Sequence, residues 1–350
     1  MSLRPPPPSR SPWQLFYGAV HRLRVAWYRD RAARLPRPVV SVGNLSWGGA
    51  GKTPTVAAVA AHLNAAGWRV AILSRGYGRR DEGEVRIISD GEGPLLGPRL
   101  AGDEPVLLAG MLPGVAVLVG AERSRAGRHA LLRLDPPPDV FLLDDGFSHL
   151  RLRRDLDILV FPAGDPFAGG WLPPGGRLRE PLAAAARADA VVLTGTPPEA
   201  APRAGDELAR ALRPYGFRGP GFASVTVTEK PRRVPAGELP GTVRALLVSG
   251  IARPEGFAAA VRELGVEVAE HLAFGDHHGY GEASLARIAQ AYHRHGANLV
   301  LVTGKDRVKL QGRLDLPLAE IPIRATPPPG FFTWLDERLA EIRGADGAPP

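Results

Sequence analysis

The sequence contains no cysteine, which excludes disulfide bonds, thiolate metal sites and a cysteine nucleophile. No apolar run approaches the ~18 to 20 residues of a membrane span, and the first ten residues lack the apolar core of a signal peptide. Aromatic residues make up only 7% of the chain and are not interleaved with a basic stripe, so base stacking has little support. We expect a protein of a reducing compartment that neither crosses a bilayer nor binds nucleic acid.

What the chain does contain is typical of a folded protein. Its 350 residues are 44% apolar and 23% charged, and this length predicts about two domains. Lysine and arginine outnumber aspartate and glutamate by 44 to 36, a formal charge of +8. This excess favours anionic partners, either nucleotides or acidic lipid surfaces.

Residues 1–37 combine a proline-rich tail with an amphipathic helix. The prolines at residues 5–8 favour an extended segment, because proline lacks the amide donor of helices and sheets. Apolar side chains then recur at helical spacing over residues 13–31, and arginines lie among them. The apolar residues are Trp13, Phe16, Tyr17, Val20, Leu23 and Trp27. Such a helix can lie in a membrane interface or pack on a core, and the pattern allows both.

Residues 38–224 alternate short β-rich runs with helical segments, which predicts an α/β domain with a mainly parallel sheet. The expected strands are 39–42, 70–73, 116–119, 140–143, 158–161 and 190–193, with helices after Lys52 and Arg123.

A smaller α/β domain with linker strands is expected over residues 225–326, after a proline-rich boundary. Its predicted strands are 245–249, 267–274 and 299–303, and its predicted helices are 255–264 and 282–295. Residues 327–350 carry a helical pattern that we expect to pack back on the first domain.

A glycine-rich segment, GNLSWGGAGKTPT, lies between a predicted strand and a predicted helix, the context that a phosphate loop requires. Lys52 offers a charge to the β- and γ-phosphates, and Thr53 can place a hydroxyl on Mg²⁺. Ser46 departs from the glycine that the motif expects there. The backbone amides expected to hold the phosphates belong to Gly48, Gly49, Ala50 and Gly51.

Acidic residues follow at two further places. Asp144 and Asp145 end an apolar strand, a position suited to holding the metal. Asp103 and Glu104, in GDEP, form an acid pair that can accept the proton of an acceptor hydroxyl; a helix start with a capping aspartate is the alternative. We group Glu104 with the metal-associated acids.

Three arginines, Arg75, Arg123 and Arg177, occupy loops after predicted strands, where parallel sheets bind ligands and a γ-phosphate needs charge stabilisation. Each alone could be a solvated surface arginine.

Two further polar groups come from the second domain. His277 and His278 follow Asp276 in a predicted loop, where a histidine can tune a carboxylate base; a metal site there lacks further ligands. A second strand-end cluster, Thr303, Lys305 and Asp306, reads more readily as structural ion pairs.

Several blocks together resemble the tetraacyldisaccharide 4'-kinase family of lipid A biosynthesis. They are VSVGNLSWGGAGKTPT, LSRGYGRR, GDEPVLLA, DDGFSHLRLRRDLDI, LPPGGRLREPL, AFGDHH and TGKDRVKL, over residues 39–310. The resemblance implies transfer of phosphate from Mg-ATP to the 4' hydroxyl of a tetraacylated glucosamine disaccharide 1-phosphate. It also implies a peripheral protein at the cytoplasmic face of the bacterial inner membrane, with a membrane-contacting N-terminal helix. We expect a monomer.

Carried over by motif, the resemblance makes Asp103 the proton acceptor, assisted by His277. It implies that Arg75, Arg123 and Arg177 contact phosphate or substrate. The chain departs from the family pattern at Ser148, Gly275, Gly304 and Arg307, where glutamine, proline, glutamate and a small residue are usual. Ser148 adjoins the acidic pair and bears on the nucleotide or metal geometry.

Two other functions compete with the kinase. A nucleotide-switch ATPase would use the related KGGxGKT loop, although Trp47 replaces its lysine. A peripheral lipid-binding protein with a structural nucleotide leaves GDEP and DHH unexplained.

Overall fold

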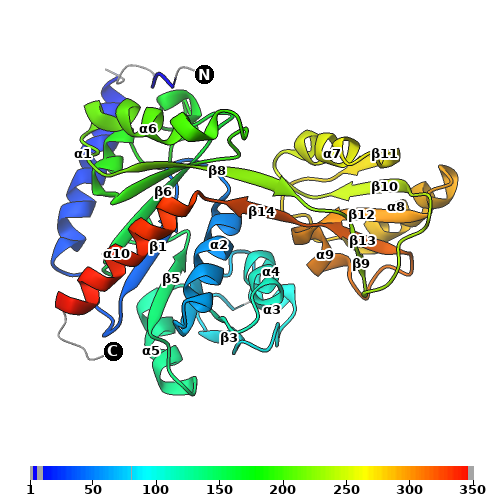
Figure 1. Ribbon diagram of the computed structural model, residues 1–350, viewed down its shortest axis with the longest axis horizontal. Helices are drawn as coiled ribbons and strands as arrows, with labels where there is room; N and C mark the ends of the chain where they lie inside the picture. The colour runs from blue at the N-terminus through cyan, green and yellow to red at the C-terminus, as the bar shows by residue number, and fades with distance from the viewer. Residues whose placement is uncertain (1–2, 6–10, 80, 346–350) are drawn as a thin grey trace.

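The structure is a computed structural model that describes residues 3–5, 11–79 and 81–345. Two β-sheets with helices packed against them lie side by side along the longest axis of the molecule (Figure 1). The predicted α/β class with a mainly parallel sheet is confirmed. Residues 6–8 of the predicted proline run lie outside the described part of the chain.

The large sheet has nine strands in the order β14-β8-β7-β6-β1-β5-β2-β4-β3. The strands from β8 to β4 are parallel, and the edge strands β14 and β3 are antiparallel to their neighbours. The strand bounds are β1 (Val39–Gly43), β2 (Val70–Ser74), β3 (Arg86–Ser89), β4 (Ala116–Val119), β5 (Val140–Asp144), β6 (Leu156–Pro162), β7 (Ala190–Thr194), β8 (Gly221–Thr228) and β14 (Ile323–Thr326).

Helices cover both faces of this sheet, which is why its central strands are apolar almost throughout. On β1, Val40 and Val42 join the core under α2, α4 and α10, whereas Val39 packs toward α5 on the opposite face. The helices are α2 (Lys52–Ala65), α3 (Pro98–Ala101), α4 (Asp103–Met111), α5 (Arg123–Arg133), α6 (Ala201–Leu212) and α10 (Pro329–Ala345). Short 3-10 turns span Ala168–Gly170, Leu182–Arg187 and Arg213–Tyr215.

The small sheet has five strands in the order β11-β10-β12-β13-β9, and β9 is antiparallel to β13. The strands are β9 (Arg232–Val234), β10 (Arg244–Ser249), β11 (Glu267–Ala273), β12 (Leu299–Thr303) and β13 (Leu318–Ile321). The helices that accompany it are α7 (Pro254–Glu263), α8 (Glu282–Arg294) and α9 (Gly304–Leu310).

The chain passes between the two sheets along an antiparallel pair, β8 and β14, whose register runs from Val225↔Thr326 to Thr228↔Ile323. Figure 1 shows both strands extending from the large sheet toward the small one. After β14, α10 returns to the large sheet and buries Phe331, Leu335 and Leu339 in its core.

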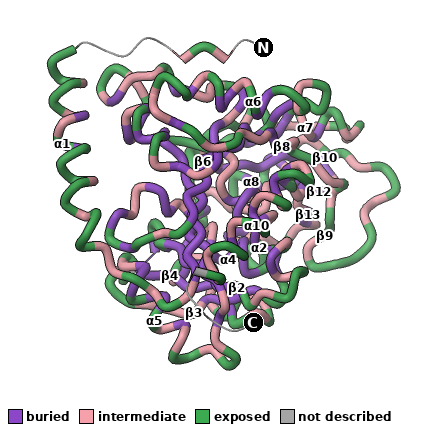
Figure 2. Tube along the Cα trace, turned by 60° about the vertical axis from the view of Figure 1, so that its left-hand side comes forward, coloured by how far each residue is buried: buried purple, intermediate pink, exposed green. Residues whose placement is uncertain are grey.

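The N-terminal helix α1 (Pro12–Arg29) lies along the outside of the molecule and is exposed over most of its length (Figure 2). Only Gly18 and His21 are buried in it. Its exposed apolar side chains are Trp13, Leu15, Phe16, Val20, Leu23 and Trp27. Of the apolar positions predicted for this helix, Tyr17 packs against a core cluster, whereas the exposed side chains do not form part of a core. Within the described residues, no helix has the length and apolar character to span a membrane.

Candidate active site

The phosphate loop joins the buried strand β1 to α2, and its backbone geometry requires glycine. Gly48 and Gly51 have φ angles of 101° and 74°, in the left-handed region. A Cβ on Gly51 would also lie 2.9 Å from the Cβ and Oγ1 of Thr194. Helix α2 begins directly after Gly51, so the unpaired amides of its first turn and the positive end of its dipole adjoin the loop. This arrangement binds phosphate.

Lys52 lies beside the loop at the first position of α2. Its Nζ donates a hydrogen bond to Asn44 Oδ1 at 3.0 Å and lies 3.7 Å from Asp145 Oδ1. Thr53, next along the helix, is buried. The ammonium is thus held by polar partners at the edge where β1 and β5 end.

Asp144 ends β5, which pairs with both β1 and β2 and so brings this carboxylate next to the phosphate loop. Its Oδ2 accepts a hydrogen bond from Ser74 Oγ at 3.2 Å, whereas its Oδ1 is buried with no hydrogen-bond partner among the described residues. Burial, with the nearby charges of Glu104 and Asp145, raises the pKa of Asp144 to about 7. An unpaired, desolvated carboxylate oxygen here is suited to a cation.

Asp145, its neighbour, has the opposite electrostatics. Burial acts to raise its pKa, but hydrogen bonds from Arg179 and the charge of Lys52 lower the pKa to about 2. Arg179 donates to both carboxylate oxygens, at 2.8 and 2.9 Å, a bidentate pair. Asp145 also adopts a φ of 54°, uncommon for a residue with a side chain.

Arg179 occupies the place that was predicted for Arg177. Besides Asp145, its guanidinium contacts the side chain of Asn44 in the phosphate loop. Arg177 instead pairs with Asp165 and is half exposed beside a small separate cavity. Asn44 was not singled out from the sequence, and Arg177 was chosen although Arg179 lies only two residues away. Alternation along an extended segment places both arginines on the same side and cannot choose between them.

The other two predicted arginines differ in burial. Arg123 begins α5, is 5% exposed, and donates to the Ala121 carbonyl at 3.1 Å. Burial lowers the pKa of Arg123 to about 10, against the opposing charges of Asp144 and Asp145. Arg75 is exposed and lies 3.5 Å from a carboxylate oxygen of Glu82.

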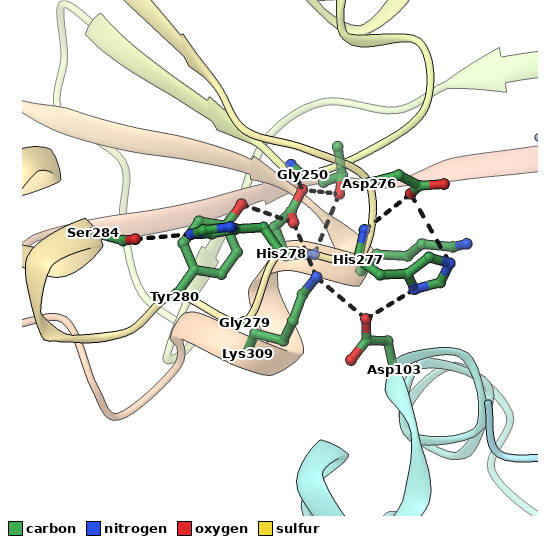
Figure 3. Close-up of polar contacts among 12 residues, drawn as sticks. Asp103, Gly250, Asp276, His277, His278, Gly279, Tyr280, Ser284 and Lys309 are labelled. Atoms are coloured by element: carbon green, nitrogen blue, oxygen red, sulfur yellow. Dashed lines mark hydrogen bonds and ion pairs between the residues drawn. The ribbon is translucent and has the colours of Figure 1, made fainter. Parts of the chain in front are cut away.

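Asp103 and Glu104 form the first turn of α4, with Asp103 inside the helix rather than at its cap. The small sheet completes their surroundings, as Figure 3 shows for Asp103. His277 Nδ1 lies 3.4 Å and Lys309 Nζ 3.2 Å from Asp103 Oδ2. Burial would raise the pKa of Asp103, but the His277 hydrogen bond and Lys309 hold it below its usual value. Lys305 pairs with Glu104 in the same interface.

The two histidines of the DHH segment point in different directions. His277 has a φ of 58° and faces Asp103, and that hydrogen bond raises the pKa of His277. His278 hydrogen bonds Ser284 Oγ at 2.8 Å and stacks on Phe274. In the described residues, no group of three or more histidine or acidic side chains is arranged to hold a metal by itself.

One cleft of about 1730 Å³ between the two sheets brings most of these groups together. It is lined by the residues predicted for the phosphate loop and the two acid pairs, by Arg75, Arg123 and His277, but not by Arg177, His278 or Asp306. Arg179 lines it too. Because its walls come from both sheets, this is a site that closure of one sheet on the other would enclose.

Ser148, where the chain departs from the family pattern, also lines the cleft. Its hydroxyl donates to Glu180 Oε1 at 2.6 Å. Glu180 is buried and also pairs with Arg187 and with His21 of α1. The serine therefore connects the loop that follows Asp145 to Glu180, the neighbour of Arg179.

Comparison with known proteins agrees with this geometry. Residues 10–340 match the family described as tetraacyldisaccharide-1-P 4'-kinase. The chain belongs to this family. The family resemblance predicted from the sequence is confirmed, as is a phosphotransferase with ATP and Mg²⁺.

Similar proteins cover nearly all of the chain. A tetraacyldisaccharide 4'-kinase of Pelobacter propionicus is 43% identical over 313 residues, covering 86% of this chain and 82% of its own. One from Geobacter sulfurreducens is 43% identical, covering 95% and 88%. A crystal structure of LpxK from Aquifex aeolicus in complex with ATP has a TM-score of 0.72 and 30% identity, covering 94% of this chain and 98% of that one. The nucleotide-switch alternative is not favoured.

Proposed function

We propose that this protein transfers the γ-phosphate of ATP to the 4' hydroxyl of a tetraacylated disaccharide 1-phosphate at a membrane surface. The observation that carries the proposal is the cleft, where a phosphate loop and an acid–histidine pair face the same space. A nucleotide switch needs the loop but no proton acceptor, and a structural nucleotide site needs neither the exposed cleft nor Asp103.

The loop side fits Mg-ATP. The φ angles of Gly48 and Gly51 present amides at the start of α2, and the buried Oδ1 of Asp144 lacks a partner among the described residues. Magnesium takes few protein ligands and completes its shell with phosphate oxygens and water, so Asp144 with Thr53 suffices. When bound, Mg²⁺ supplies charge neutralisation on the phosphates.

Cationic side chains stabilise the transferring group. Lys52 is placed to contact the β- and γ-phosphates, with Arg179 and Arg123 nearby on the same rim. Arg179 already neutralises Asp145, so the arginine is fixed before substrate arrives. Fixed charges of this kind need no rearrangement during the reaction.

Asp103 is the proton acceptor in this mechanism. It is ionised at neutral pH because its pKa is held low, so it can take the proton of the attacking hydroxyl. His277 hydrogen bonds Asp103 Oδ2 and orients the carboxylate. Phosphoryl transfer needs mainly positioning and charge stabilisation, which this arrangement provides.

Helix α1 is the part of the protein that we assign to the membrane. Its inner side is polar: Gln14 and Tyr17 hydrogen bond Leu172 and Arg179 carbonyls, and His21 pairs with Glu180. Its apolar side chains are left outside. A helix attached through its polar side and apolar toward solvent is suited to burial in an acyl boundary.

The amphipathic helix and the acylated substrate support a peripheral position on a bilayer, and we propose the cytoplasmic face of the inner membrane, where ATP is available. We treat residues 38–224 and 225–326 as two domains that close over the substrates, and 327–350 as a return to the first. We propose a monomer, because both halves of the cleft come from one chain.

The direct test supplies γ-labelled ATP and a tetraacylated disaccharide 1-phosphate to the purified protein in mixed micelles. Label should appear in the lipid at the 4' position, and only when both substrates are present. Hydrolysis of ATP at the same rate with or without the glycolipid would instead indicate a nucleotide switch.

A further inference from the structure

Helix α9 of the small sheet packs against α4 of the large sheet at the side of the cleft. Its two lysines lie one turn apart on the same side, and each meets one of two adjacent acids. Lys305 pairs with Glu104, and Lys309 Nζ lies 3.2 Å from Asp103 Oδ2. The helices are closely packed there, since a Cβ at Gly304 would lie 2.9 Å from a methyl group of Leu107.

Lys309 is a buried ammonium, 6% exposed, held on its other side by Asp306. Asp306 is fully buried and well fixed: it accepts hydrogen bonds from the Tyr280 hydroxyl at 2.9 Å, the Gly250 amide at 3.0 Å and the Thr303 hydroxyl at 2.6 Å. The distance from Lys309 Nζ to Asp306 Oδ1 is 3.5 Å. The lysine is therefore attached to a rigid support in the small sheet.

A purely structural ion pair would need only Asp306, because one carboxylate neutralises one buried ammonium. Lys309 nevertheless also contacts a second carboxylate, Asp103 on α4 of the large sheet. Figure 3 shows Lys309 and His277 meeting the same oxygen of Asp103. Both contacts fall on Oδ2 of Asp103, so Oδ1 remains the oxygen that can accept a proton from substrate.

We propose that Lys309, supported by Asp306, is a positioning residue for phosphoryl transfer: it holds Asp103 by Oδ2 and leaves Oδ1 for the acceptor hydroxyl. The proposal rests on the proposed function, in which Asp103 accepts that proton. Since Lys309 belongs to α9 and Asp103 to α4, the base is oriented only while the two helices are in contact. Closure of the cleft then orients Asp103 at the same time as it encloses the substrates.

The test compares lysine variants by steady-state and single-turnover kinetics on the full chain. In Lys309→Met combined with Asp306→Asn, both charges are removed, so no unpaired carboxylate stays buried. We expect kcat to fall about 10- to 100-fold, the scale of misplacing a reacting group by about 1 Å, with KM for ATP within about twofold. Lys309→Arg keeps the cation and should recover most of the loss.

A double-mutant cycle separates positioning from structure. In an Asp103→Ala background, adding Lys309→Met and Asp306→Asn should cause no further loss of kcat, because the lysine acts through the missing carboxylate. The control is Arg154→Met, which breaks a buried ion pair with Asp157; neither residue lines the cleft. It should lower the melting temperature and leave kcat of the folded protein unchanged.

Three results would overturn the proposal. The first is a near-wild-type kcat in Lys309→Met combined with Asp306→Asn. The others are a kcat for Lys309→Arg as low as that of this double variant at equal thermal stability, or a full further loss of kcat when the double variant is added to Asp103→Ala. Each is read against a wild-type protein that labels the glycolipid. If the wild type itself transfers no label, it is the proposed function that fails.

Discussion

The two sides of the cleft are built in different ways. On the nucleotide side, Lys52 hydrogen bonds Asn44, eight residues away, and the acids end a strand of the same sheet. On the acceptor side, Asp103 meets His277 at a sequence separation of 174 residues, across two sheets. The nucleotide side is formed as soon as the large sheet folds, whereas the acceptor side forms only when the two sheets are in contact. Nucleotide binding and base assembly are thus separable properties.

The substitution with the largest expected effect is Asp103→Ala, on the acceptor side. It removes the proton acceptor and leaves the phosphate loop intact, so kcat should fall about 10³-fold while KM for ATP changes little. Steady-state kinetics with circular dichroism as a folding control measures this. Wild-type turnover in the folded variant would remove Asp103 from the role.

The matching change on the nucleotide side is Lys52→Ala. Loss of a charged contact to phosphate should weaken Mg-ATP binding about 100-fold, measured by calorimetry on the free enzyme. The exposed Lys230 gives a matched control, and Lys230→Ala should bind as the wild type does. Unchanged affinity in Lys52→Ala would contradict the whole assignment of the loop.

A smaller effect on the nucleotide side distinguishes Arg179 from Arg177. Arg179→Ala frees Asp145 and Asn44 and should raise KM for ATP about 10-fold. Arg177→Ala removes only the exposed pair with Asp165 and should change KM less than about twofold. Equal effects of the two substitutions would mean that the structure has not distinguished the arginines.

Helix α1, which we propose contacts the membrane, extends the comparison beyond the two sheets. Replacing Leu23 and Trp27 with glutamate should lower partitioning onto anionic vesicles about 10-fold, because the apolar area that enters the bilayer is lost. Leu132→Glu, at an exposed leucine of α5, is the matched control. Sedimentation with vesicles measures both, and equal partitioning of the two proteins would contradict the assignment of α1.

The smallest effect concerns stability. Asp144 has a folded pKa of about 7 against 3.8 unfolded, so the unfolded chain loses its proton first as pH rises. The carboxyl group therefore lowers the free energy of unfolding progressively from about pH 4 to 7, and this destabilisation persists at higher pH. Asp144→Asn without nucleotide should raise the melting temperature by a few degrees at pH 8 and hardly at all at pH 4. A pH-independent change would indicate a packing effect.

Agreement between sequence and structure follows the range of the interactions. The predicted central strands match β1, β2, β4, β5, β6 and β7 within two residues, because each is a buried apolar run bounded by turns. The edge strands β3, β9 and β14 were missed, as was β13, which pairs with β9; each is only three or four residues long. Their pairing depends on neighbours that no local pattern reveals.

The sequence by itself determined the phosphate loop, the acidic strand end and the family, because each is a contiguous motif whose chemistry depends on neighbouring residues. Only the tertiary structure chose Arg179 over Arg177, turned His277 rather than His278 toward Asp103, and brought Lys309 to the same carboxylate. These choices depend on side-chain direction and on the contact between α4 and α9. Both are set by packing between segments far apart in the chain.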